Sequence, residues 1–257
     1  MRQRFSLARF LASTSLVAAV AMGLGGCSAM PKLSDVTGSV GPRAEAAPTD
    51  PARAVEVYGE RYRANPRDAD AALGYGQALR ANGQRAQAAA VLEQATIANP
   101  GNRALLAQYG RALADNGNFQ QAFDVLTRAH TPEDPDWRIL SAQGAALDQL
   151  GRNEEAQQYY AAALKIAPDE PQVLSNLGLS YMLQNNLPRA EQVLGRAYQR
   201  NQSDVRVRAN LALVLGLQGR QAEAEILVKA DLPPDQAAAK VAALRQLLEK
   251  KQQRADK

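Results

Sequence analysis

The stretch PQVLSNLGLSYMLQNNLPRAEQVLGRAYQRNQ, from Pro171 to Gln202, decides the fold, because its key positions recur every 34 residues along the chain. Four independent columns share this period without an insertion. They hold a small residue, a leucine or tyrosine, a glycine or asparagine, and an alanine. In that order the columns are Gly76, Gly110, Gly144, Gly178 and Ala212; Leu79, Leu113, Leu147, Tyr181 and Leu215; Gly83, Gly117, Gly151, Asn185 and Gly219; and Ala88, Ala122, Ala156, Ala190 and Ala224.

The glycines of two columns indicate different local structures. A glycine inside a helix costs about 1 kcal/mol relative to alanine, so the column of Gly178 needs a packing reason. We expect the first helix of each repeat to approach the second helix there, at the recurring alanine. The column of Gly83 falls between the two helices, where a positive φ is expected, and Asn185 is the residue that best replaces glycine in that conformation.

The pattern resembles the tetratricopeptide repeat (TPR), in which W-x₂-L-G-x₂-Y…A-x₃-F…P is spread over 34 residues. In the repeat quoted above, its positions are filled by Leu174, Leu177, Gly178, Tyr181, Ala190 and Leu194. The resemblance implies an all-α fold, a right-handed TPR superhelix. The solenoid is expected over 51–234, as a half-repeat at 51–68 followed by repeats at 69–102, 103–136, 137–170, 171–204 and 205–234.

The C-terminal region departs from the repeat and indicates a cap. Leu232-Pro233-Pro234 stops the last helix pair, because proline cannot continue a helix. Asp235 is then expected to cap a final amphipathic helix within residues 235–257. A solenoid needs such a C-terminal capping helix with one polar face. The apolar face of this helix holds Val241, Leu244, Leu247 and Leu248.

The first 26 residues are typical of a bacterial lipoprotein signal peptide. Three arginines precede an apolar stretch, Leu11 to Leu24, that is too short to span a membrane. Leu24-Gly25-Gly26-Cys27 resembles the lipobox, in which the cysteine is lipidated and becomes the new N-terminus. An ordinary secretory signal with an incidental cysteine is the alternative. Ser28 after the cysteine implies, by the same resemblance, the outer membrane facing the periplasm, and residues 27–50 are expected to form a flexible tether.

Charge and composition exclude several classes of function. The net charge is +4, and removing the three arginines of the signal peptide leaves 4 − 3 = +1, so nucleic-acid binding loses its support. With one cysteine and one histidine, the chain has no Cys-cluster metal site and little catalytic equipment. His130 is interpreted as a helix-end residue and Trp137 as a packing residue. We therefore expect no enzyme activity, cofactor, metal or small-molecule substrate.

The concave face of the superhelix is the expected binding surface. By family resemblance it is lined from places 2, 5, 9, 12 and 13 of each repeat. In the first three repeats this lining is mixed and polar, and in the last two it becomes apolar. Two alternatives stay open for the apolar residues: the C-terminal helix covers them, or a segment of a protein partner binds there. The polar residues are Asp70, Gln77, Arg80, Arg111, Asp115, Arg138 and Asp148, and the apolar ones are Leu179, Met182, Leu183, Leu213 and Leu217.

The closing run from Arg208 to Leu248, with ADLPPDQAAA as its most specific element, resembles the TadD lipoproteins of Flp/Tad pilus assembly. That resemblance implies a membrane-anchored adaptor whose partner is a pilus secretin subunit, acting as a pilotin-like helper. The alternative is a general cell-envelope scaffold, in outer-membrane barrel assembly or in the regulation of an envelope enzyme.

Overall fold

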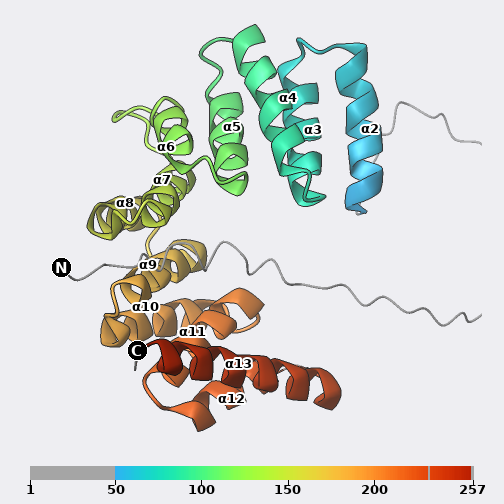
Figure 1. Cartoon of the computed structure of the whole chain (residues 1–257). Helices are drawn as coiled ribbons and strands as arrows, with labels where there is room; N and C mark the ends of the chain where they lie inside the picture. Colours follow the sequence, from blue (N-terminus) through green and yellow to red (C-terminus); the bar gives the residue numbers. More distant parts are fainter. Residues whose placement is uncertain (1–49, 231, 256–257) are drawn as a thin grey trace, which may run out of the picture.

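The computed structural model describes residues 50–230 and 232–255, which form twelve helices (Figure 1). The expected signal peptide, Cys27 and the expected tether up to residue 49 lie outside the described residues. The helices are α2 (Pro51–Ala64), α3 (Ala69–Ala81), α4 (Arg85–Ala98), α5 (Arg103–Asp115), α6 (Phe119–Thr127), α7 (Trp137–Gln149), α8 (Asn153–Ile166), α9 (Pro171–Leu183), α10 (Leu187–Arg200), α11 (Val205–Leu217), α12 (Gln221–Lys229) and α13 (Pro234–Ala255).

Helices α3 to α12 form five pairs, and each pair turns at a residue with positive φ. Four of these residues are glycines, such as Gly83 with φ of 77°, and the fifth is Asn185 with φ of 60°. This confirms the expected backbone at the turn column. Glycine meets that conformation without a steric penalty, and asparagine tolerates it better than other residues with a side chain.

The glycines inside the first helices allow close packing, but against a different residue than expected. A Cβ atom at Gly178 would lie 2.5 Å from Cγ of Leu194, and one at Gly110 would lie 2.6 Å from Cγ of Leu126. The expected partner was the recurring alanine; at Gly110 the carbonyl oxygen of Ala122 does lie 3.3 Å from that Cβ, but in both repeats the nearest atoms belong to the leucine. The leucine one turn further along the second helix reaches over the glycine, because its side chain is long enough to fill the space between the helices.

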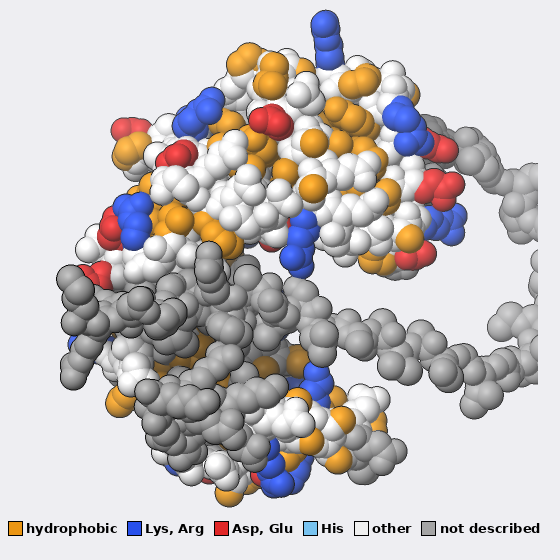
Figure 2. Space-filling model, in the orientation of Figure 1, with side chains coloured by type: hydrophobic (Ala, Val, Ile, Leu, Met, Phe, Trp, Pro, Cys, Tyr) orange, Lys and Arg blue, Asp and Glu red, His pale blue; other side chains and the backbone are white. Residues whose placement is uncertain are grey.

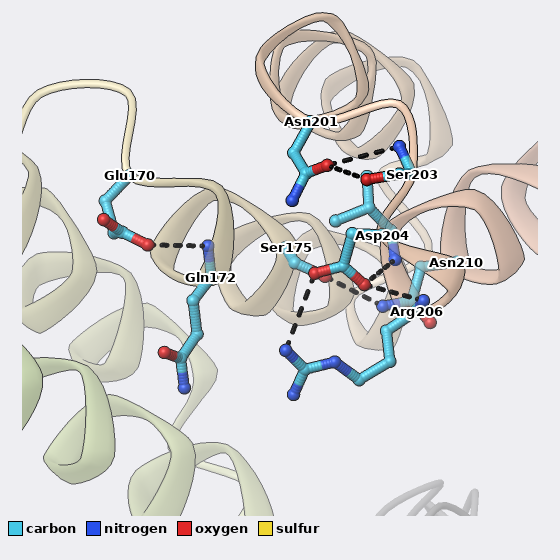
Figure 3. Close-up of polar contacts among 9 residues, drawn as sticks. Glu170, Gln172, Ser175, Asn201, Ser203, Asp204, Arg206 and Asn210 are labelled. Carbon is cyan, nitrogen blue, oxygen red and sulfur yellow. Dashed lines mark hydrogen bonds and ion pairs between the residues drawn. The ribbon is translucent and has the colours of Figure 1, made fainter. Parts of the chain in front are cut away.

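An acid or an amide stands before each first helix and caps it. Asp204 accepts a hydrogen bond from the backbone N–H of Arg206 at 2.8 Å, and Glu170 accepts one from Gln172 at 3.5 Å (Figure 3). These bonds satisfy N–H groups that have no partner within the helix. The column comprises Asp68, Asn102, Asp136, Glu170 and Asp204.

The helix pairs stack into an arc (Figure 1). First helices of successive repeats contact each other throughout, from α3 and α5 to α9 and α11, and they line the inner side of the curve. Helix α13 continues the stack by packing mainly on α12 and also on α11. It begins at Pro234, one residue before the expected cap Asp235, and the side chains of Leu247 and Leu248 lie outside the described part.

Candidate protein-binding groove

The inner side of the arc is a groove floored by α3, α5, α7, α9 and α11. Figure 2 shows an open hollow between the repeats at the two ends of the arc, with Lys and Arg side chains on both of its sides. The first helices reach this groove because their other faces are used by the second helices and by the neighbouring repeats. The side chains that the sequence places at the lining positions therefore decide what the groove can bind.

Hydrogen bonds join successive first helices across the groove floor. The side-chain amide of Asn176 donates to Ser141 Oγ at 3.1 Å, and that of Asn210 donates to Ser175 Oγ at 2.9 Å (Figure 3). In both pairs the residues are 35 positions apart, so the same link recurs from one repeat to the next. These links fix the register of α7, α9 and α11, and they present the lining side chains on a defined surface.

The polar stretch of the groove lies over α3, α5 and the start of α7. Arg80 Nε donates to Asp115 Oδ2 at 2.6 Å, and Arg80 also donates to Gln108 at 3.0 Å. Arg111 is half-buried beside them, and burial lowers the pKa of its guanidinium, with repulsion from Arg80 lowering it further. Arg138 is exposed and its guanidinium lies 4.5 Å from the ring centre of Trp137. This stretch is rich in paired charges.

Asp148 does not line the groove as an open polar residue, because it lies buried between the third and fourth repeats. Its carboxylate accepts hydrogen bonds from Asn153 Nδ2 at 2.8 Å, Ser180 Oγ at 2.7 Å and Tyr160 OH at 2.9 Å. Asp148 is 5% exposed, Tyr160 1% and Ser180 0%. Burial raises the pKa of Asp148, and the three hydrogen bonds oppose that rise. We call Asp148, Asn153, Tyr160 and Ser180 the buried polar node.

The sequence interpretation missed this node, although the sequence carries a signal for it. Tyr160 stands where the equivalent second-helix residues are leucines in the other repeats that have a first-helix glycine: Leu92, Leu126 and Leu194. Ser180 stands where the equivalents in the three preceding repeats are alanines. A polar group that replaces an apolar one at a buried place needs a hydrogen-bonding partner. Two such replacements in adjacent repeats therefore indicate that the side chains of Tyr160 and Ser180 lie close together.

The apolar stretch of the groove lies on α9 and α11. Four of the five predicted residues are half-buried: Leu179, Leu183, Leu213 and Leu217. The fifth, Met182, is 7% exposed and belongs to the buried cluster of the last two repeats.

Helix α13 takes part in covering this end of the solenoid. Leu244 packs against the same buried cluster that Leu179, Leu213 and Leu217 contact. Leu183 is not among the residues packed against that cluster in the described part of the chain. The cap therefore contributes to this cluster, while Leu179, Leu183, Leu213 and Leu217 each stay only partly buried.

His130 lies in the joint between the second and third repeats, after the end of α6. Helix α6 ends at Thr127, and His130 Nε2 lies 3.1 Å from Gln143 Oε1. Gln143 is 1% exposed and also donates to Thr127 Oγ1 at 3.0 Å. Buried glutamine is held here by hydrogen bonds. The contact gives the histidine a structural role in closing a shortened second helix.

Two absences among the described residues concern other kinds of site. Those residues contain no group of three or more His, Cys, Asp or Glu side chains placed to hold a metal ion. None of their helices combines the length and apolar character needed to cross a membrane.

Comparison with solved structures returns TPR proteins. PilW, described as a widely conserved type IV pilus biogenesis factor, superposes with a TM-score of 0.65 at 18% identity, over 75% of this chain and 91% of that chain. TTC0263, a thermophilic TPR protein of Thermus thermophilus, superposes with a TM-score of 0.62 at 20% identity, over 70% of this chain and 100% of that chain. At these identities the likeness is one of fold. No curated protein matches the sequence.

Two family models, both described as tetratricopeptide repeat, match the sequence itself. One matches residues 46–109, 79–144, 113–177 and 147–213, and the other matches 205–225. Together these matches cover more than half of the chain, and they span helices α2 to α11 and the start of α12. The chain belongs to the tetratricopeptide repeat family, as an all-α solenoid of the kind that binds protein partners.

Proposed function

We propose that this chain is a lipid-anchored adaptor that holds a segment of a protein partner in its groove during assembly of the Flp/Tad pilus secretin. The observation that carries the binding role is the half-exposed leucine surface of Leu179, Leu183, Leu213 and Leu217 on α9 and α11. Leucines four apart share one face of a helix, and equivalents 34 apart lie on neighbouring first helices. A protein segment with apolar side chains fits such a surface.

Two likenesses support the assignment to pilus assembly. One is the C-terminal run with ADLPPDQAAA, which resembles the TadD lipoproteins. The other is the shared fold with PilW, whose description names type IV pilus biogenesis. Anchoring through Cys27 to the outer membrane, on the periplasmic side, would raise the effective concentration of the groove where the secretin ring forms.

The binding role is tested with two double variants and a purified secretin. In Leu183→Asp with Leu217→Asp, each carboxylate would have to lose its water against an apolar ligand, so we expect capture of the secretin to be lost. The matched control is Ile97→Asp with Ile226→Asp, which places the same charges on exposed residues of α4 and α12. The control is expected to bind like the wild type.

Thermal unfolding of the same variants separates binding from packing. An unchanged melting temperature together with lost capture supports the groove. A melting temperature lowered well below that of the control would mean that these leucines are core residues under α13, and the proposed binding surface would be wrong. Failure of the wild type to capture the secretin, while it captures another envelope protein, would overturn the pilus assignment.

The anchor is tested by Cys27→Ser. Because the sequence contains one cysteine, no other thiol can carry the lipid. We expect metabolic labelling with palmitate to be lost, an uncleaved precursor to accumulate, and the protein to leave the outer-membrane fraction. Labelling that persists in this variant would contradict the anchor.

A further inference from the structure

Arg111 differs from the other arginines of the groove because nothing in the described part of the chain pairs with it. It lies on α5 and is half-buried, yet no hydrogen bond or ion pair joins it to another described residue. Arg80 is held by Asp115 at 2.6 Å, and Arg138 lies over Trp137 and 4.0 Å from Asp136. Among the described residues of this stretch, Arg111 is therefore the cation whose guanidinium is partly removed from solvent and makes no hydrogen bond or ion pair.

The acids near Arg111 are already engaged elsewhere. Asp115 accepts the hydrogen bond from Arg80, and Asp136 caps α7 by accepting the backbone N–H of Arg138 at 2.7 Å. Both are close enough to influence Arg111 electrostatically, but neither approaches within ion-pair distance. Counting Arg80, Arg111 and Arg138 against these two acids leaves one excess positive charge.

The cost of keeping the Arg111 guanidinium half-buried without a partner indicates which kind of ligand would stabilise it. A charged group that is partly removed from water is unfavourable unless it is paired and hydrogen-bonded. Burial and the repulsion from Arg80 both lower the pKa of Arg111, so its surroundings disfavour the cation as it stands. A carboxylate can accept two parallel N–H bonds from a guanidinium, and it would reverse that cost.

We propose that Arg111 binds a carboxylate of the partner segment that lies in the groove. This inference rests on the proposed function and adds the chemistry of the ligand. A single carboxylate suits the site better than a polyanion, because Asp115 and Asp136 flank Arg111 and would repel additional negative charge. The apolar leucines of α9 and α11 lie two and three repeats further along the same groove. The ligand is thus an extended segment with an acidic group at one end and apolar side chains at the other.

The experiment uses a library of random peptides displayed on phage and selected on the full chain held by its C-terminus. Wild-type protein is expected to enrich peptides that carry Asp or Glu at a constant spacing from apolar residues. Arg111→Gln is expected to enrich apolar peptides without the acid. Leu183→Asp with Leu217→Asp is expected to enrich neither class. The matched control is Arg103→Gln, an exposed residue of the same helix whose partner Asp134 lies outside the groove lining.

Affinities of one enriched peptide then measure the effect. Loss of a charge-assisted hydrogen-bonded pair corresponds to weaker binding by about 10- to 100-fold. We expect this loss for Arg111→Gln, no change for Arg103→Gln, and weaker wild-type binding as salt is raised. A form of the peptide with an amidated C-terminus shows whether the carboxylate belongs to a side chain or to the chain end. The melting temperature of Arg111→Gln should not fall, because the guanidinium has no partner in the described chain.

The outcomes separate this inference from the proposed function. Wild-type selection of apolar peptides without an acid preference, or equal affinity in Arg111→Gln, would overturn the role of Arg111 and leave the leucine surface intact. A marked drop in the melting temperature of Arg111→Gln would show that the residue is structural, and would also overturn it. Selection that does not differ between the wild type and the double Asp variant would overturn both.

Discussion

The first two repeats and the fourth and fifth repeats use the same helix packing to present different surfaces. In the second repeat a Cβ at Gly110 would lie 2.6 Å from Leu126, and in the fourth a Cβ at Gly178 would lie 2.5 Å from Leu194. At the ninth place of the same first helices, however, the second repeat carries Arg111 and the fourth carries Leu179. The residues that set the fold and those at the expected lining positions of the groove are therefore separate.

The third repeat lies between these two regions and belongs to both. On α7, Ile139 packs into the hydrophobic cluster of the first two repeats, while Leu140 and Leu147 pack into the next cluster. The buried polar node around Asp148 then links α7 to α9. Solenoid repeats contact only their neighbours, so this node is one of the contacts through which the two regions are coupled.

The largest effect is expected from Gly178→Ala, which adds a methyl group where Leu194 already lies. The leucine is 0% exposed and its Cγ would lie only 2.5 Å from the added Cβ, so overpacking should destabilise the chain by about 1–3 kcal/mol. Because solenoid energetics are local, hydrogen exchange should accelerate in α9, α10 and their neighbours while α3 and α4 keep their protection.

Gly110→Ala is the control, because it makes the equivalent change in the second repeat. It should loosen α5 and α6 and leave α11 and α12 protected, because its clash is with Leu126. Uniform acceleration over the whole chain in both variants would show that the solenoid unfolds as one unit, and the distinction between the two regions would be lost.

Much of the fold follows from the repeated columns because each repeat gives independent evidence for the same conformation. The positive φ at Asn185 and the tight packing at Gly178 were both predictable from five aligned positions. The cap column of Asp204 recurs in the same way, so the sequence also carries a signal for these helix starts. The partner of Gly178 could not be assigned from spacing alone, since Ala190 and Leu194 lie one turn apart on the same helix face.

The groove was less predictable because its residues do not repeat. Asp148 occupies a lining position, yet it is buried at 5% exposure because Ser180 and Tyr160 offer hydrogen bonds from two other helices. Met182 is buried for the opposite reason, since an apolar side chain joins the nearby cluster. Position within a repeat gives the direction of a side chain, while its neighbours in adjacent repeats decide how far it is exposed.

The next prediction concerns how the contribution of the buried polar node to folding stability depends on pH. Burial raises the pKa of Asp148 above 3.8, so the folded chain binds this proton more tightly than the unfolded chain. Protonation therefore favours folding, and the contribution of Asp148 to stability falls as the pH rises from 3.8 through the raised pKa. In Asp148→Asn this contribution is absent.

The measurement is the difference in melting temperature between the wild type and Asp148→Asn across the acidic range. The difference should shift in favour of the variant as the pH rises. Other acids act in the opposite sense: hydrogen bonds from Arg196 and Arg200 lower the pKa of Asp169, for example, so only the difference isolates Asp148. A difference that stays constant with pH would contradict the raised pKa.

The smallest effect is expected from Gly195→Ala, and its sign is opposite to that of Gly178→Ala. Gly195 lies within α10 at an ordinary helical φ, and a Cβ there would meet no atom within 4 Å. Alanine should therefore stabilise the chain by about 0.5–1 kcal/mol, because glycine loses more backbone freedom on folding. Gly195 faces a surface groove of about 760 Å³ between α10 and α12, formed with Leu211, Leu215 and Ile226, and not the groove lined by the first helices. Peptide binding by Gly195→Ala should consequently match the wild type while its melting temperature rises. If the melting temperature rose but peptide affinity fell, the partner would contact the second helices too, and the binding surface would extend beyond the concave face.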